Sequence, residues 1–171
     1  AMHFEWAKRE SAYRMVEKNG KFRLVTNKGA MGEIHEAHVE KMLQRRGFEV
    51  IDAKLPGNTG IDILAVKRDA SGQVVRVWVV ECKATGQDRV NSPHLSNTKK
   101  GKQLTSTWVA EKIEKMYRQG GHLRASATLL RQNLAQVRTV VAFQKQGINS
   151  WAHQNRVPEF KPQQVEDILR E

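Results

Sequence analysis

The segment that most constrains the fold is the run VVRVWVVECKA at residues 74–84. From Val74 to Val80 it carries apolar side chains at successive positions, and Arg76 is the exception. A strand that is apolar on both faces is typical of the centre of a sheet with another layer packed on each side. The sequence therefore predicts an α/β domain whose sheet is covered by helices.

A second apolar run, GIDILAVKR at residues 60–68, contains one carboxylate, Asp62. A half-buried strand normally avoids Asp, because a buried charge is costly unless something pairs with it. The turn-forming residues DASGQ separate the two runs and predict an antiparallel hairpin. With a four-residue loop at 70–73, Asp62 lies directly opposite Glu81, and the two Cβ atoms are about 5 Å apart.

Two carboxylates at this separation repel each other, and a divalent cation between them removes the conflict. Oxygen ligands of this kind suit Mg²⁺ or Mn²⁺. Because side chains alternate along a strand, Glu81 and Lys83 share one face while Cys82 points to the other. In the alternative, Asp62 caps a turn and Glu81 pairs with Lys83 on the surface. The position of Asp62 opposite Glu81 would then be a coincidence.

The other patterns predict a helix, three strands, one or two helices and a strand, followed by a terminal helix. The predicted segments are a helix at 29–46 that stops at Gly47, strands at 48–53, 60–68 and 74–84, helices at 103–118 and 122–136, a strand at 137–143 and a helix at 162–170. Before them, residues 3–18 are moderately helical and 21–27 are typical of a short strand. We expect a core at 29–144, flanked by an N-terminal extension at 1–28 and a C-terminal extension at 145–171.

The charge balance indicates a polyanionic partner. The chain has 29 Lys and Arg against 18 Asp and Glu, a formal net charge of +11, and basic surfaces bind nucleic acid by releasing counterions from phosphates. An anionic membrane surface is a weaker alternative, and no apolar run reaches the length of a membrane span. The single cysteine, Cys82, excludes an internal disulfide and a cysteine-based zinc site. Ala1 and Met2 resemble the remnant of a cleaved expression tag, and we expect the chain to be the C-terminal part of a longer protein.

Asp62, followed about 20 residues later by Glu81-x-Lys83 at a strand end, resembles the PD-(D/E)XK (restriction-endonuclease-like) nuclease superfamily, as does the αβββαβ order of elements. Ile61 stands where the motif has Pro. The resemblance covers residues 29–144 and implies that Asp62, Glu81 and the backbone carbonyl of Cys82 bind Mg²⁺, with Mn²⁺ or Zn²⁺ as alternatives. It also implies that Lys83 positions the attacking water and stabilises the developing charge.

The first core helix of this superfamily supplies a further acid, and MGEIHEAHVEKMLQRRGF at 31–48 resembles that helix. Glu36 falls at the edge of its apolar stripe, whereas Glu33 and Glu40 are expected to lie further toward solvent. We favour Glu36 as the helix acid, which would bind a second metal ion or hold a water on the metal. Glu33 stays open, because GE at 32–33 resembles the start of this helix in several toxin nucleases.

The segment GKQLTSTWV at 101–109 resembles an element of the nuclease domains of bacterial polymorphic toxins, including contact-dependent and type VI secretion effectors. Gln103, expected at a helix start, would hold a phosphate there, and Trp108 is expected in the core. The expected nucleic-acid contacts are Lys99, Lys100, Lys102 and His94. Among the other histidines, His35 and His38 have a possible ligand spacing without forming a recognisable zinc pattern.

These observations predict a Mg²⁺-dependent endodeoxyribonuclease of low sequence specificity. The toxin resemblance implies an effector passed by a secretion apparatus into the cytoplasm of a competing bacterium, where a cognate immunity protein would neutralise it. The alternatives are a housekeeping Holliday-junction resolvase or restriction-type endonuclease, and a non-catalytic nucleic-acid-binding module.

Overall fold

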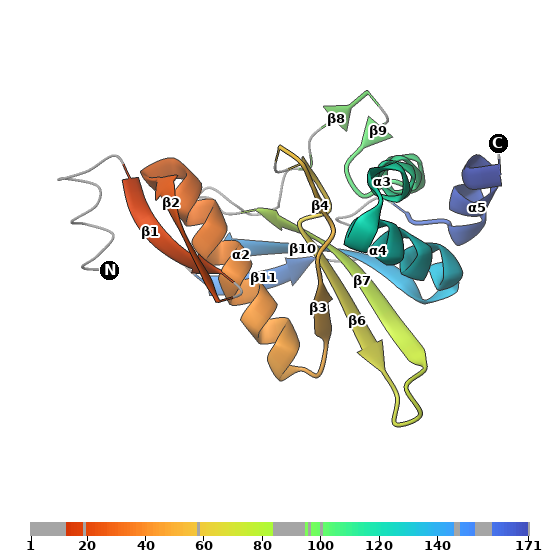
Figure 1. The fold of residues 1–171 in the computed structure, drawn as a ribbon, viewed down its shortest axis with the longest axis horizontal. Helices are drawn as coiled ribbons and strands as arrows, with labels where there is room; N and C mark the ends of the chain where they lie inside the picture. The colour runs from red at the N-terminus through yellow and green to blue at the C-terminus, as the bar shows by residue number, and fades with distance from the viewer. Residues whose placement is uncertain are drawn as a thin grey trace.

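The structure, a computed structural model, describes residues 13–18, 20–57, 59–83, 95, 97–99, 101–145, 148–152 and 159–170. A mixed five-stranded sheet occupies its centre, in the order β11-β10-β7-β6-β3 (Figure 1). The strands of this sheet are β3 (Glu49–Ile51), β6 (Ile63–Arg68), β7 (Val74–Lys83), β10 (Val137–Lys145) and β11 (Ile148–Ala152). β10 runs parallel to β7, and the other neighbours are antiparallel. The predicted mixed α/β architecture is confirmed, with β7 at the centre.

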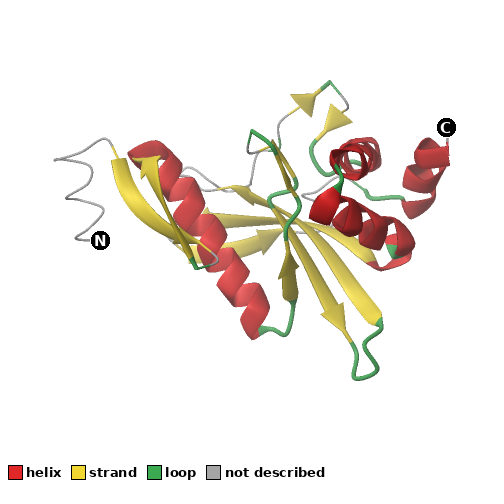
Figure 2. Cartoon of the chain, viewed as in Figure 1, coloured by secondary structure: helices red, strands yellow, loops and turns green. Residues whose placement is uncertain are grey.

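The two faces of the sheet are covered by different helices (Figure 2). Alternating residues of β6 and β7, such as Ile63 and Val80, pack with Val39 and Leu43 of α2 (Asn27–Arg45). The opposite faces of these strands pack against the other helices, which are α3 (Ser106–Gln119), α4 (Gly121–Gln132) and α5 (Pro162–Arg170). A short 3-10 turn, η1 (Leu134–Gln136), connects α4 to β10. This two-sided covering explains the apolar residues at successive positions of 77–80.

The N-terminal region differs from the prediction. Residues 13–18, predicted to be helical, form the strand β1 (Tyr13–Lys18), which pairs with β2 (Lys21–Thr26) across a turn in which Gly20 has φ +74°. Glycine adopts this left-handed conformation without steric cost. Pairing in the hairpin therefore overrides the moderate helical propensity of 13–18, and the hairpin packs beside α2 (Figure 1).

Two further hairpins lie in connections that carried no strand signal. β4 (Lys54–Leu55) pairs with β5 (Thr59–Gly60), and β8 (Asn97–Thr98) pairs with β9 (Gly101–Lys102). Gly60 has φ +90°, and a Cβ there would lie 3.2 Å from the side chain of Leu55. The β4–β5 hairpin folds back just before Asp62, so it brings Lys54 to the same end of the sheet as the acidic residues.

Candidate nuclease active site

Asp62 and Glu81 lie opposite each other at the end of the β6–β7 hairpin. Ile63 pairs with Val80 in the antiparallel ladder, and continuing that register by one residue sets Asp62 against Glu81. The predicted register is therefore confirmed, but the loop is not the predicted four residues. Arg68 pairs with Val74 across an irregularity beside Lys67, so the loop spans 69–73. The register is shifted only at the tip of the hairpin and is unchanged at the site.

Hydrogen bonds fix each carboxyl group. The backbone N–H of Cys82 donates to Asp62 Oδ2 at 2.9 Å, so the strand that carries Glu81 also orients Asp62. Glu81 Oε1 accepts a bond from Gln103 Nε2 at 3.0 Å and lies 3.5 Å from Lys83 Nζ. The second oxygen, Glu81 Oε2, is buried and accepts no hydrogen bond within the described part of the chain.

The electrostatics of the pair follow from burial and mutual repulsion. The side chain of Glu81 is only 7% exposed. Burial, together with the negative charge of Asp62, raises the pKa of Glu81 to about 8, although Lys83 opposes the shift. Burial also raises the pKa of Asp62, against the hydrogen bond from Cys82, and the charge of Glu36 raises it further. Without a cation, the two carboxyls therefore resist ionising together.

Gln103 links the lysine to the carboxylate. Lys83 Nζ donates to Gln103 Oε1 at 3.0 Å, and the amide nitrogen of Gln103 faces Glu81. Because an ammonium group only donates, the amide oxygen has to face Lys83, which fixes the orientation of the amide. Gln103 thus holds Lys83 and Glu81 in one network, whereas the sequence predicted a phosphate contact.

Gln103 precedes α3 instead of starting it, which corrects the predicted helix boundary. Thr105 is the N-cap, and its side chain accepts from the N–H of Trp108. Leu104 between them has φ +69°, a left-handed conformation that is rare for residues other than glycine. Its side chain is fully buried, as is that of Trp108, whose predicted core position is confirmed. Core packing at Leu104 therefore holds the strained turn that presents Gln103.

Glu36, from α2, is connected to the site by an ion pair with Lys54. Lys54 Nζ lies 2.8 Å from Glu36 Oε1 and 2.9 Å from Glu36 Oε2, and 4.0 Å from Asp62 Oδ1. The sequence analysis missed Lys54. The turn residues PGNTG after it at 56–60 were the available signal, because they fold the chain back on itself before Asp62.

The other helix acids are not where they were predicted. Glu33 and Glu40 are buried, although they were expected to face solvent. The helix lies between the sheet and the β1–β2 hairpin, so a side of it that was expected to be exposed is covered (Figure 1). Glu36 contacts Lys54, whose ammonium group also lies 4.0 Å from Asp62 Oδ1. This contact favours Glu36 as the helix acid of the site.

Only some of the remaining candidate residues lie in the described part of the chain. Lys99 and Lys102 are exposed near the β8–β9 hairpin, while Lys100 and His94 lie outside the described residues. His35 is buried on α2, and its Nε2 lies 3.0 Å from the carbonyl oxygen of Ala142. This contact ties His35 to the backbone of the sheet, which is a structural role for the imidazole.

Comparison with known families adds one finding. Residues 31–107 match the restriction endonuclease family model Mrr_cat. This part of the chain is therefore similar to a restriction-endonuclease domain. Neither the curated proteins nor the solved structures gave a match. Restriction endonucleases hydrolyse DNA, so the match supports a nuclease domain that acts on DNA.

The matched range of the restriction-endonuclease domain runs from α2 into the first turn of α3. It therefore contains every residue of the cluster described above, from Glu36 to Gln103. The strand β10 completes the sheet beyond this range, by pairing with β7 along its whole second half. The described part of the chain has no helix with the length and apolar character of a membrane span.

Restriction-endonuclease-like domains generally use divalent metal ions, and the acidic pair fits one. Glu81 Oε2 is a buried oxygen without a hydrogen-bond partner among the described residues, and Asp62 lies opposite Glu81 in the hairpin. Mg²⁺ is commonly bound by one or two carboxylates and retains several waters. The described residues contain no group of three or more His, Cys, Asp or Glu side chains arranged to hold a metal ion. The fit therefore rests on two carboxylates, with the Cys82 carbonyl as a predicted third ligand.

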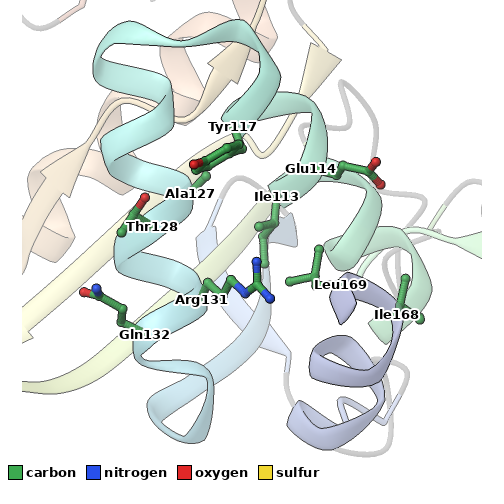
Figure 3. A pocket seen from close by; sticks show the side chains of 9 residues that line it. All are labelled: Ile113, Glu114, Tyr117, Ala127, Thr128, Arg131, Gln132, Ile168 and Leu169. Carbon is green, nitrogen blue, oxygen red and sulfur yellow. The ribbon is translucent and has the colours of Figure 1, made fainter. Parts of the chain in front are cut away.

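A cavity lies elsewhere in the described part of the chain. It has a volume of about 470 Å³ and lies between α3, α4 and α5, where Tyr117, Arg131 and Leu169 contribute to its lining (Figure 3). None of the acidic residues of the site lines it. The candidate site at the end of the β6–β7 hairpin is therefore separate from this cavity.

Proposed function

We propose that the domain hydrolyses DNA phosphodiester bonds in a metal-dependent reaction of low sequence specificity at the Asp62–Glu81–Lys83 cluster. The observation that carries this proposal is the opposition of Asp62 and Glu81 in the hairpin, with Lys83 on the same face. An acid pair that resists full ionisation is suited to a divalent cation, because the cation favours the charged form of both groups.

Each residue of the cluster would have a separate role in the reaction. Asp62 and Glu81 would hold the metal ion, together with the carbonyl of Cys82. A bound divalent ion supplies polarisation of the scissile phosphate and a lower pKa for an attacking water. Lys83 would orient that water and stabilise the negative charge that develops on the phosphate oxygens. Gln103 keeps the ammonium group in place, because its amide oxygen accepts from Lys83 Nζ.

DNA binding would rest mainly on charge. The net charge of +11 gives affinity for the phosphate backbone without reading bases. The exposed Lys99 and Lys102 lie on the approach to Gln103 along the chain, and Lys100 lies between them. We expect binding and cleavage to weaken steeply as the salt concentration rises, since counterion release drives the association.

Plasmid cleavage with matched variants tests the proposal. Supercoiled DNA is incubated with the wild-type protein, Asp62→Asn or Lys83→Met, in Mg²⁺, Mn²⁺, Zn²⁺ or EDTA, with RNA as a parallel substrate. We expect cleavage only with a metal ion, and a loss of about 100-fold or more in both variants. Lys112→Met is the control, because Lys112 is a partly buried lysine that pairs with Glu111 outside the site. Wild-type rates in Asp62→Asn or Lys83→Met would refute the assignment.

For the biological role, we propose an antibacterial toxin that acts in the cytoplasm of a target bacterium, after delivery by a secretion apparatus, and is held inactive by an immunity protein. The resemblance of 101–109 to toxin nucleases supports this role. A restriction-type role is the second candidate, because the matched family is a restriction endonuclease. Growth arrest on cytoplasmic expression, relieved by Asp62→Asn and unaffected by host DNA methylation, would support the toxin. Protection by methylation would support restriction.

A further inference from the structure

Lys54 occupies the space between the helix acid and the acidic pair. Its ammonium group contacts both carboxylate oxygens of Glu36 at 2.8 and 2.9 Å and lies 4.0 Å from Asp62 Oδ1. The Lys54 side chain is 20% exposed and that of Glu36 is 8% exposed. A contact to both oxygens of a nearly buried carboxylate gives this ion pair little solvent screening.

The positions of these three groups resemble those of two anionic ligands around one cation. Glu36 and Asp62 come from different elements, α2 and the segment before β6, and a carboxylate oxygen of each lies within 4.0 Å of Lys54 Nζ. Lys54 is the positive charge placed between them. A second divalent ion, held by Glu36 and Asp62, would need the same space.

We propose that Lys54 takes the place of a second metal ion, so that the site binds one divalent cation, at Asp62 and Glu81, and Glu36 serves as the counter-charge of Lys54. This inference rests on the proposed metal-dependent function, and it specifies the metal content of the same site. It differs from the expectation that Glu36 is itself a metal ligand, because both oxygens of its carboxylate already face an ammonium group.

The β4–β5 hairpin explains how a lysine is held there. Lys54 pairs with Gly60 in that hairpin, two residues before Asp62, so the backbone fixes the start of the side chain relative to the acid. Asp52 Oδ1 also accepts from the backbone N–H of Lys54 at 3.1 Å. The ammonium group is therefore carried on an ordered backbone segment, and its position is set before any ligand binds.

The test is the number of Mn²⁺ ions bound per chain, measured by titration calorimetry and by electron paramagnetic resonance of free Mn²⁺. We expect one ion in the wild-type protein and two in Lys54→Met, because the substitution removes the positive charge that lies between Glu36 and Asp62. Lys112→Met should bind one ion and is the control for the loss of a paired lysine. In EDTA, Lys54→Met should melt at a lower temperature than the wild type. Added Mn²⁺ should raise the melting temperature of Lys54→Met to that of the wild type.

The double variant Glu36→Gln/Lys54→Met removes the ion pair without changing the net charge. It should bind one ion with an affinity within a few-fold of the wild type, so it tests the inference even where Lys54→Met does not fold. Two ions in the wild type, one ion in a folded Lys54→Met, or a large loss of affinity in the double variant would overturn the inference alone. No ion in the wild type would overturn the proposed function as well.

Discussion

Replacing Glu81 by glutamine should stabilise the metal-free protein at alkaline pH. Burial and the charge of Asp62 raise the pKa of Glu81 from 4.5 to about 8 in the folded state. Between these values the folded protein binds one proton more than the unfolded chain does, so the free energy of unfolding falls as pH rises. At about 1.4 kcal/mol for each pH unit, the loss reaches at most about 5 kcal/mol above pH 8.

The Glu81→Gln variant lacks this titration and keeps the contact with Gln103, because the substituted side chain still offers an amide oxygen to Gln103 Nε2. The unfolding free energy of Glu81→Gln should therefore exceed that of the wild type by several kcal/mol at about pH 9 and by little at about pH 5.

Urea unfolding in EDTA, followed by circular dichroism across this pH range, measures the difference. Glu159→Gln is the matched control, because the side chain of Glu159 is exposed, and its pH profile should parallel that of the wild type. Excess Mg²⁺ at high pH should stabilise the wild type more than Glu81→Gln, since binding to the folded state raises its stability. Parallel pH profiles for the wild type and Glu81→Gln would refute the reasoning.

Three further predictions concern the support of the site. Gln103→Ala should lower the rate of plasmid cleavage by about 10- to 100-fold in single-turnover assays and leave the DNA affinity unchanged. The reason is that it removes the contacts that orient Lys83 and Glu81. An unchanged cleavage rate would contradict this role. Leu64→Ala should cost about 2–5 kcal/mol in urea unfolding, because Leu64 is fully buried between the sheet and the helices. Gly60→Ala should lower the stability by about 1–2 kcal/mol, measured by thermal unfolding, because φ is +90° and the new Cβ would lie 3.2 Å from Leu55.

The acidic pair was predictable from the sequence because a hairpin is a local structure. Its register depends on the loop between two strands, and counting from the turn DASGQ was enough to oppose Asp62 and Glu81. The irregularity beside Lys67 shows why the loop length was still wrong. A bulge adds a residue near the tip without changing the pairing beyond it.

The contacts that come from distant parts of the chain were not predictable in the same way. Nothing in the pattern around Lys54 shows that its ammonium group meets Glu36, since the two residues belong to different elements and pack together only in the folded protein. The burial of Glu33 and Glu40 was missed for a related reason. The β1–β2 hairpin packs beside α2, and helical periodicity alone does not reveal a second covering layer.

The strained turn at Leu104 has a consequence for the response of the protein to heat. The left-handed backbone of Leu104 persists because its side chain is anchored in the core, and the same turn presents Gln103 to Lys83. Loosening of the start of α3 would release the strain and withdraw Gln103 while the central sheet is still intact. Catalysis is then expected to fail on heating before the fold does, so the temperature of inactivation should lie below the melting temperature of the sheet.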